Sequence, residues 1–448
     1  MAQISYIKYT DVLEARRYDA EYFKPEYLEI DKKIASHDFN VLQKITHKID
    51  VGFVGSMTKE YCEEGILLLQ TKNIEEFSLN LSQTTFINEK FHKKLKKSQV
   101  NYGDILIARS GSFGKASIYM EKEVCNSSDI IIVEGDNGLI NNFYLVAFLN
   151  SKFGVGQLMK FASGGLQGHV NLTILESLKI SLLPQSFQLQ IEEIVKSAHQ
   201  KQTQSKQLYR EAEQLLLQEL GLLNYQVKHS LTFTTTKKEV EEAHRYDSEY
   251  FQPKYAEIIK KIEGYEGGWD LVKNQFKQNT TLSKKDGDYC NYIEISDVNV
   301  SNGEITPNRV EIKDIPANGK RKLFKNDLLI SKVRPYRGAI SFIDFEVDNL
   351  IGSGAFTVLQ EKTGYKKEVL MIFLKTVFIK ELLLRYNCGT SYPVIKDEDI
   401  LNLQIPLIKP SIQKQIAEKI QESHRLRKES KELLDEAKRK VEEEIEKE

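Results

Sequence analysis

The chain has few of the residues that mark several protein classes. Its four cysteines stand far apart and never form a CxxC pair, so neither a zinc knuckle nor a disulfide framework is predicted. No run approaches the roughly eighteen apolar residues that a membrane span needs. Residues 1–10 lack the basic-then-apolar layout of a secretion signal. We therefore expect a cytoplasmic protein with buried thiols.

An excess of charge is also missing. The formal net charge is −1 at pH 7 and the sequence pI is near 6.8. A nucleic-acid surface would therefore have to come from local clustering of basic residues. A hydrophobic content of 41%, with one Trp but 21 Tyr and 21 Phe, is typical of globular cores. The length favours roughly two to four folding units.

Motifs for catalysis are missing as well. The eight histidines are scattered without an HExxH pattern, and no Asn-Pro-Pro-Tyr or Asp-Pro-Pro-Tyr motif of an amino-methyltransferase occurs. Residues 111–116 resemble a phosphate loop, but Arg109 stands where the first glycine is needed and Ala116 replaces the magnesium-binding Ser or Thr. The paired carboxylates at 19 and 21 and at 247 and 249 lie among Tyr, Phe and Arg, as in a packing or capping segment. We predict no catalytic residue, no metal site and no cofactor in this chain.

What the sequence does contain is an internal repeat. Residues 17–25 read RYDAEYFKP and residues 245–253 read RYDSEYFQP, with two differences in nine positions. Chance does not produce such a match, so the chain is a tandem of two related halves. After each proline, apolar residues at helical spacing predict a short amphipathic helix with Pro25 or Pro253 in its first turn.

Each half ends in a long amphipathic segment, at residues 186–220 and 411–445. Apolar side chains recur there at alternating steps of four and three residues, which places them on one seam of a helix about 50 Å long. The narrow seams favour a coiled coil of the two helices, within one chain or between two, although polar Lys201 and Ser205 interrupt the first. The predicted seam consists of Phe187, Ile191, Ile194, Ala198, Leu208, Ala212, Leu215, Ile412, Ile416, Leu426, Leu433 and Ala437.

A strand-like segment recurs within each half. Residues 103–109 (GDILIAR) and 326–332 (NDLLISK) each read as a turn that leads into a buried strand and ends in a basic residue. The loops that follow differ, with SGSFGK at 110–115 and VRPYRG at 333–338. The scaffold therefore repeats while the loops diverge.

Both loops lie in basic stretches. Residues 90–115 contain seven lysines or arginines and the single acid Asp104, and residues 318–337 contain seven and the single acid Asp327. Basic stretches at matching places, beside loops with Gly, Ser, Tyr and Arg, predict phosphate contacts and base-edge readout. The alternative is a non-catalytic coiled-coil scaffold that binds proteins rather than DNA, which would lack a salt-dependent affinity for duplexes. A catalytic enzyme is a second alternative, which methylation or cleavage by the purified chain would support.

The layout resembles the DNA-specificity (S) subunit of type I restriction-modification enzymes over essentially the whole chain. In the second half, Val333-Arg334-Pro335 departs from the Gly-rich turn that is usual in the family. The order of the resembling segments, duplicated around two long helices, is specific, although no single segment is diagnostic. They are residues 65–66, 71–74, 103–115 and 180–184 before Gln190-Ile191, and residues 327–330 and 405–408 before Gln415-Ile416.

The resemblance implies an α+β fold. Two tandem target recognition domains, which are small β-rich globular modules, are separated and joined by two long helices that form an antiparallel coiled coil with pseudo-two-fold symmetry. The modules are expected at residues 1–183 and 229–408, and the helices at residues 184–228 and 409–448. Each module reads one half of a bipartite, asymmetric DNA site, and the helices set the spacing.

The resemblance also implies partners. Two methyltransferase (modification) subunits dock on the chain and use S-adenosylmethionine, and two restriction subunits use ATP and Mg. None of these cofactors belongs to this chain, and no membrane is involved. The candidate contacts to double-stranded DNA are Arg109, Lys115, Lys332, Arg334 and Arg337 for phosphate or guanine, Ser110, Ser112 and Tyr336 for base edges, and Lys72, Asn73 and Gln167 as polar loop residues.

Overall fold

The computed structural model describes residues 4–81, 83–109, 114–136, 138–162, 170–389 and 392–447. Contacts divide the chain into two compact units, with residues 1–202 and 428–448 in unit 1 and residues 203–427 in unit 2. Each unit combines helices with small, mainly antiparallel sheets, so the predicted α+β class is confirmed. Within the described ranges, no helix is both long and apolar enough to cross a membrane.

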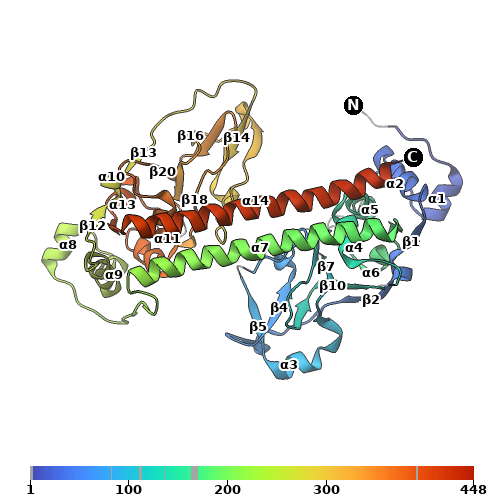
Figure 1. Ribbon diagram of the computed structural model, residues 1–448, viewed down its shortest axis with the longest axis horizontal. Helices are drawn as coiled ribbons and strands as arrows, with labels where there is room; N and C mark the ends of the chain where they lie inside the picture. The colour runs from blue at the N-terminus through green and yellow to red at the C-terminus, as the bar shows by residue number, and fades with distance from the viewer. Residues whose placement is uncertain are drawn as a thin grey trace. The chain divides into compact units, whose positions relative to one another are not determined.

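Unit 1 contains two sheets and a strand pair (Figure 1). One sheet has the order β3-β5-β4-β9-β6, the other β2-β10-β7-β8, and β1 pairs with β11. Only β4 and β9 run parallel among the described pairs. The strands are β1 Phe39–Val41, β2 Thr46–Val51, β3 Tyr61–Cys62, β4 Ile66–Gln70, β5 Thr85–Ile87, β6 Gln99–Val100, β7 Ile105–Ala108, β8 Ala116–Ile118, β9 Cys125–Ser128, β10 Ile130–Gly135 and β11 Lys179–Ser181. The helices are α1 Tyr9–Ala15, α2 Pro25–Ala35, α3 Glu89–Lys94, α4 Asn142–Asn150, α5 Lys152–Ala162, α6 Leu172–Glu176 and the first part of α7 Gln185–Glu219.

Unit 2 repeats this topology for every strand except β3. Its sheets have the orders β15-β14-β19-β16 and β13-β20-β17-β18, β12 pairs with β21, and β14 runs parallel to β19. The strands are β12 Trp269–Leu271, β13 Phe276–Gln278, β14 Tyr289–Ile293, β15 Asn308–Glu311, β16 Gly319–Lys322, β17 Leu328–Ser331, β18 Ile340–Phe342, β19 Leu350–Ser353, β20 Phe356–Glu361 and β21 Gln404–Pro406. The helices are α8 Lys237–Ala243, α9 Pro253–Glu263, α10 Val272–Gln275, α11 Lys367–Lys375, α12 Val377–Leu384, α13 Asp397–Leu401 and the first part of α14 Pro410–Glu446.

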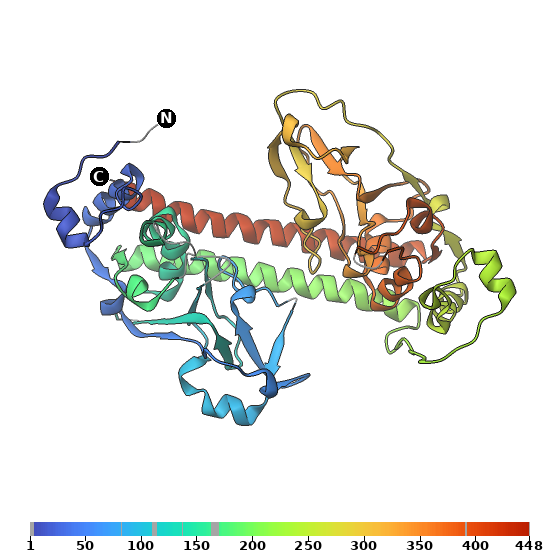
Figure 2. The same cartoon turned by 180° about the vertical axis from the view of Figure 1, so that it is seen from behind.

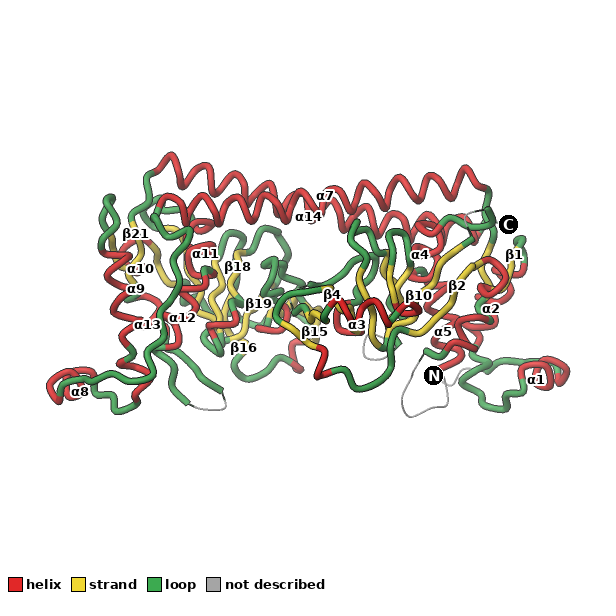
Figure 3. Tube along the Cα trace, turned by 90° about the horizontal axis from the view of Figure 1, so that it is seen from below, coloured by secondary structure: helices red, strands yellow, loops and turns green. Residues whose placement is uncertain are grey.

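In each unit, part of α7 lies beside part of α14 (Figures 1 and 3). In unit 1, Ser430 Oγ donates to the carbonyl of Ala198 at 2.7 Å, and Lys201 pairs with Glu429 at 2.7 Å. In unit 2, the Ser205 and Ser423 hydroxyls each donate to the other residue's carbonyl, at 2.7 and 2.8 Å, and Lys419 pairs with Glu211 at 2.6 Å. In both units, the number of the partner falls as the number along α7 rises. The predicted antiparallel pairing is therefore confirmed within each unit, with both helices from one chain.

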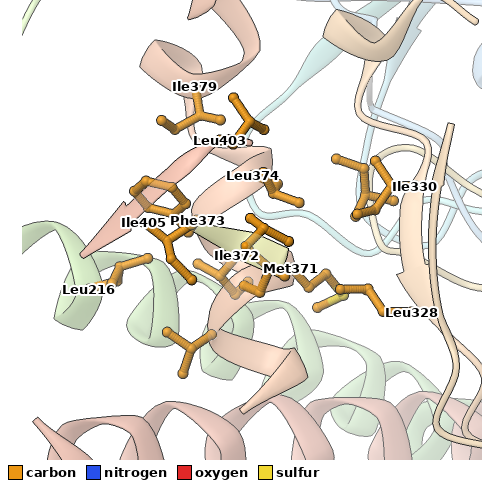
Figure 4. Packing of buried hydrophobic residues seen from close by; sticks show 14 of the residues in the cluster. Leu216, Leu328, Ile330, Met371, Ile372, Phe373, Leu374, Ile379, Leu403 and Ile405 are labelled. Atoms are coloured by element: carbon orange, nitrogen blue, oxygen red, sulfur yellow. The ribbon is translucent and has the colours of Figure 1, made fainter. Parts of the chain in front are cut away.

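The apolar stripes of the two helices also complete the cores of the units. In unit 1, Ile191, Val195, Ala437, Val441 and Ile445 belong to one buried cluster with α4, β7 and β10. In unit 2, Ala212, Leu216, Ile416 and Ile420 join a cluster that Figure 4 shows around Phe373 and Ile405. Of the predicted seam, Ile191, Ala198, Ala212, Ile416, Leu426 and Ala437 are buried, whereas Phe187, Ile194, Leu208, Leu215, Ile412 and Leu433 are half-buried.

A buried glutamine attaches each long helix to its module. Gln188 donates to the Leu183 carbonyl at 2.8 Å and accepts from the Asn141 N–H at 2.8 Å. Gln413 makes the same two bonds in unit 2, to the Ile408 carbonyl at 2.7 Å and from the Lys366 N–H at 2.9 Å. The carbonyl lies just before the long helix, and the N–H lies just before α4 or α11. The glutamine side chain gives both backbone groups a hydrogen-bond partner.

The repeated Gly-Asp or Asn-Asp motif forms a buried turn. Asp104 accepts from the Asn101 N–H at 2.7 Å, and Asp327 accepts from the Phe324 N–H at 2.9 Å. Burial raises the pKa of Asp104 to about 6, and it also raises the pKa of Asp327. The carboxylates therefore close the turns that lead into β7 and β17.

The two units differ at the end of α4 and α11. In unit 1, the Asn150 side chain bonds to both backbone groups of Ala116, at 3.0 and 2.7 Å. In unit 2, the corresponding last helical residue is Lys375, whose ammonium is buried over the Tyr209 ring and has no hydrogen-bond partner among the described residues. Burial and, to a lesser extent, the charge of Arg427 lower the pKa of Lys375 to about 7. Unit 2 thus contains a buried amine where unit 1 has a satisfied amide.

Candidate nucleic-acid interface

The basic stretch of unit 1 forms a short helix. Asn88 caps α3 by accepting from the Phe91 N–H at 2.8 Å, and the 3-10 turn Lys96–Ser98 follows. Phe91 packs against Phe53, and His92 bonds to Asn126 at 2.6 Å, so this side of the helix faces the module. The helix and the turn together carry five exposed lysines, which we call the helix patch: Lys90, Lys93, Lys94, Lys96 and Lys97. Within the described residues, only Lys93 has an ion pair, at 3.7 Å to the exposed Glu89.

The basic stretch of unit 2 forms a strand instead. Lys320 and Lys322 are exposed on β16, with Arg321 half-buried between them. The preceding loop runs along this strand, since the Ser283 N–H donates to the Lys320 carbonyl at 2.8 Å and the Lys322 N–H to the Thr281 carbonyl at 3.0 Å. This pairing brings two more lysines to the same edge. We call the set the strand patch: Lys284, Lys285, Lys320, Arg321 and Lys322.

Exposed aromatic rings accompany the strand patch. The Arg309 guanidinium lies 4.8 Å from the centre of the Tyr289 ring, and the Lys322 ammonium 5.4 Å from that of Phe324. Tyr289 is 47% exposed and Phe324 is 40% exposed. Cations neutralise phosphates and exposed rings stack on bases, so this surface can contact both parts of a nucleic acid.

Both patches lie away from the long helices of their own unit. In unit 1, α3 lies at the end of the module farthest from α7 (Figures 1 and 2). In unit 2, the sheet of β14 and β16 extends away from α14 in the same views. Each module therefore presents its basic surface on a side that its helices do not cover.

The predicted contacts at the ends of β7 and β17 have acidic neighbours. Arg109 pairs with Asp129 at 2.8 Å, and Lys332 pairs with Asp397 at 3.1 Å. Burial raises the pKa of Asp397, but a hydrogen bond from Thr357 and the charge of Lys332 outweigh it and lower the pKa below its ordinary value. Both cations are thus engaged within the protein, and a phosphate would have to compete with these carboxylates.

The remaining candidates lie in varied surroundings. Arg334 stacks on Tyr392 at 4.8 Å and begins the 3-10 turn that contains the half-buried Tyr336 and the exposed Arg337. Lys115 is half-buried, and Lys72 is exposed. Ser110, Ser112 and Gln167 lie outside the described residues.

Asn73 is buried, and its amide is used within the protein. Its oxygen accepts from the Gln70 N–H at 2.9 Å, and its nitrogen donates to the carbonyls of Asn80 and Gln83 at 2.8 and 3.1 Å. Asp297 caps the matching turn of unit 2 by accepting from the Glu294 N–H at 2.8 Å. A DNA contact by Asn73 would therefore require the exchange of these bonds.

Sequence reasoning missed part of the strand patch. Lys284 and Lys285 are far from β16 in the sequence, and only the pairing of residues 281–283 with β16 brings them beside it. A pair of lysines directly before the Asp-Gly turn signal at 286–287 was the available clue. The lysines of the helix patch fell inside the predicted basic stretch but were not singled out as contacts.

Known proteins match this chain along most of its length. The family profile described as "Type I restriction modification DNA specificity domain" matches residues 55–214 and 270–438. The type I restriction enzyme MjaVIII specificity subunit of Methanocaldococcus jannaschii is 26% identical over 363 residues, which cover 77% of this chain and 79% of that protein. The HindI specificity subunit of Haemophilus influenzae is 27% identical over 125 residues, 26% of this chain and 27% of that protein.

Solved structures match as well. The S subunit of a type I restriction-modification system from M. genitalium has 12% identity and a TM-score of 0.44, covering 91% of this chain and 95% of that one. The HsdS subunit from Thermoanaerobacter tengcongensis has 13% identity and a TM-score of 0.28, covering 91% and 96%.

Proposed function

Because the chain belongs to the family of type I restriction-modification DNA specificity subunits, we propose that it reads a bipartite, asymmetric DNA site, one half with each module. Specificity subunits of this family are non-catalytic, so the chain carries no reaction of its own. The observation that supports DNA reading by both modules is the pair of basic patches. The helix patch precedes β6, and the strand patch lies on β16, which has the same place in the strand order as β6, and on the loop that pairs with it.

The finer division of labour is part of this proposal. Residues 1–183 and 229–408 act as the two recognition modules, and the helices at 184–228 and 409–448 set the gap between the half-sites. The antiparallel contacts of α7 and α14 and the glutamines Gln188 and Gln413 support a rigid spacer, because they attach each helix both to its partner helix and to its module. Two modification subunits dock on the chain, and two restriction subunits complete the assembly.

We propose two kinds of contact with DNA, to phosphates and to bases. Lysines of the helix and strand patches bind phosphates, together with Arg337 and Lys72, whereas Arg334, Tyr336 and the residues of the loop at 110–115 read bases. Arg109 and Lys332 contribute if DNA displaces Asp129 and Asp397. Phosphate contacts weaken binding to all sequences alike when removed, but base contacts change the preferred sequence.

A selection experiment tests the proposal. The purified chain, together with the modification subunit of its own system, is offered random duplexes, and the bound fraction is sequenced. We expect a split motif with a fixed gap, and exchange of residues 1–183 for another module is expected to change one half only.

Glutamine substitutions of the helix patch are expected to lower the affinity for DNA and keep the selected motif. A matched control replaces Lys237 and Lys238, which already pair with Glu241 and Glu242 in α8. A complex that forms but selects no motif would contradict the proposal and favour a protein-binding scaffold.

A further inference from the structure

The nine-residue repeat builds the same structure in both units. Arg17 makes two bonds to Asp19, at 2.6 and 2.8 Å, and Arg245 makes two to Asp247 at the same distances. The residue before each arginine adopts a left-handed conformation, with φ of 52° and 49°. Each proline opens a helix, α2 or α9. The motif is therefore a structural element that both halves retain.

The second tyrosine and the phenylalanine of the motif also have internal contacts. The rings of Tyr22 and Phe23 meet edge-on at 4.9 Å, and those of Tyr250 and Phe251 at 5.0 Å. The guanidinium of Arg17 lies 5.0 Å from the Tyr22 ring, and that of Arg245 lies 4.9 Å from the Tyr250 ring. Packing within each unit is a sufficient reason for these residues to recur.

The first tyrosine of the motif differs from the residues described above, because it is exposed. Tyr18 is 78% exposed and Tyr246 is 86% exposed. Neither side chain makes a hydrogen bond or ring contact with the part of the chain that the structure describes. Other exposed residues of the preceding segment are not retained, since Tyr9 corresponds to Lys237 and Leu13 to Glu241. A large aromatic side chain that recurs without an internal contact is explained by an external one.

The charges of the motif favour a protein over DNA as that partner. Each arginine is held by an aspartate, and the next cation is held by a glutamate, with Lys24 at 2.5 Å from Glu21 and Lys254 at 3.1 Å from Glu249. The carboxylates thus neutralise the cations that a phosphate would need. The residue before the arginine is Arg16 in one copy and His244 in the other, so no additional cation is retained there.

A pocket lies beside the motif in unit 2. It measures about 760 Å³ and is lined by Arg245, Asp247 and Glu249 from the motif, together with Lys254, Glu381 and Asn387. Charged groups of both signs line it, which suits a polar protein segment rather than a polyanion. The motif thus offers an exposed ring next to a recess.

We propose that Tyr18 and Tyr246 are equivalent docking points for two modification subunits, one on each half of the chain. The inference rests on the proposed function, since it takes the modification subunits as the partners. A partner that is present twice needs a surface that occurs twice, and this tyrosine occurs once in each half. The tyrosine ring supplies apolar contact area and its hydroxyl a hydrogen bond, as is usual for tyrosines at interface centres.

The test measures assembly of the full-length chain with the modification subunit. Native mass spectrometry gives the number of bound subunits, and a titration gives the affinity of each site. We expect two subunits on the natural chain. Tyr18→Ala and Tyr246→Ala should each weaken one of the two sites at least tenfold, and the double variant should weaken both. The Phe variants should retain most of the affinity, because the ring remains.

Tyr102→Ala is the matched control, because Tyr102 is a 54% exposed tyrosine outside the motif, and it should leave both sites unchanged. Unchanged assembly of folded Tyr18→Ala and Tyr246→Ala variants would overturn the inference. The same holds if the variants lose only DNA affinity or only self-association, since the surface would then serve DNA or a second copy. If the natural chain binds no modification subunit, the proposed function fails and the inference fails with it.

Discussion

Unit 1 and unit 2 share one order of strands but place their cations on different secondary structure. The helix patch lies on α3 and the 3-10 turn that follows it, whereas the strand patch lies on β16 and the loop that pairs with it. Apart from the exposed tyrosines Tyr18 and Tyr246, the shared positions described above are mostly buried: the glutamines at the helix starts, the aspartates of the turns and the apolar residues of the cores. Buried side chains therefore preserve the scaffold, while the surface at and before the edge strands β6 and β16 is free to change.

Removal of the cations of the two patches should change DNA binding most strongly and to different extents. Replacing Lys90, Lys94, Lys96 and Lys97 by Gln should remove about four phosphate contacts, reduce the slope of log K against log salt by about 3.5, and lower the affinity about 100-fold at low salt. Replacing Lys284, Lys320 and Lys322 should reduce the slope by about 2.7. Fluorescence anisotropy over a salt series measures both. Equal slopes for all variants and the natural chain would show that the patches do not contact DNA.

The next prediction compares the free energies of unfolding of variants at Asn150 and Lys375. Asn150→Ala should destabilise the protein by about 1 to 3 kcal/mol, because the Ala116 N–H loses its partner and the Ala116 carbonyl keeps only the bond from the Phe77 N–H. Lys375→Met should instead stabilise it by about 1 to 3 kcal/mol at pH 7, since it removes a buried amine without a described partner. Unfolding in urea measures both free energies. A destabilising Lys375→Met would mean that the amine has a favourable contact.

The pH dependence of the Lys375 effect has a defined sign. Its pKa in the folded protein is about 7, below the ordinary 10.5. Between these values the unfolded chain binds more protons, so this group makes the unfolding free energy rise as pH increases from 7 to 10.5. Lys375→Met should remove that rise, which checks that the stability change at pH 7 comes from the buried amine.

A smaller effect concerns Asp104. Its folded pKa of about 6 lies above the ordinary 3.8, so the folded protein binds more protons between these values. The unfolding free energy should therefore fall by about 2 kcal/mol as pH rises from about 4 to 6, and stay reduced above that. Asp104→Asn should abolish this change. The equivalent Asp327→Asn should have its own, separate effect, because Asn279 and Gln360 also donate to Asp327, at 2.9 and 2.6 Å.

The smallest predicted change in stability concerns the hydrogen bonds between α7 and α14. Ser205 and Ser423 exchange hydrogen bonds in unit 2, but Ser430 faces Ala198 in unit 1. Ser205→Ala should cost about 1 kcal/mol, and Ala198→Ser should gain up to about 0.5 kcal/mol by supplying the missing hydroxyl. Thermal unfolding of both variants measures the difference. A loss of stability in Ala198→Ser would show that unit 1 has no room for the second hydroxyl.

Much of the scaffold follows from local sequence patterns. The repeated prolines predicted the starts of α2 and α9, and the apolar periodicity predicted α7 and α14 nearly to their ends. The site was less predictable, because it depends on contacts that are distant in sequence. Arg109 meets Asp129 and Lys332 meets Asp397, and no local pattern announces either pair. Ser205, which interrupts the seam in the sequence, is buried and bonded to Ser423.

Unit 1 consists of two separate stretches of the chain, so it cannot be completed until unit 2 has been synthesised. Unit 2 is continuous and ends at residue 427, whereas unit 1 needs residues 428–448 as well as residues 1–202. Its core includes Ala437, Val441 and Ile445, which are synthesised after all of unit 2. At roughly 5 to 20 residues per second, the first module waits about 10 to 50 s for these side chains after residue 202 has been made. During that interval the apolar side chains of α4 and α7 that pack against Ala437, Val441 and Ile445 lack these partners, so unit 1 begins before unit 2 and is completed after it.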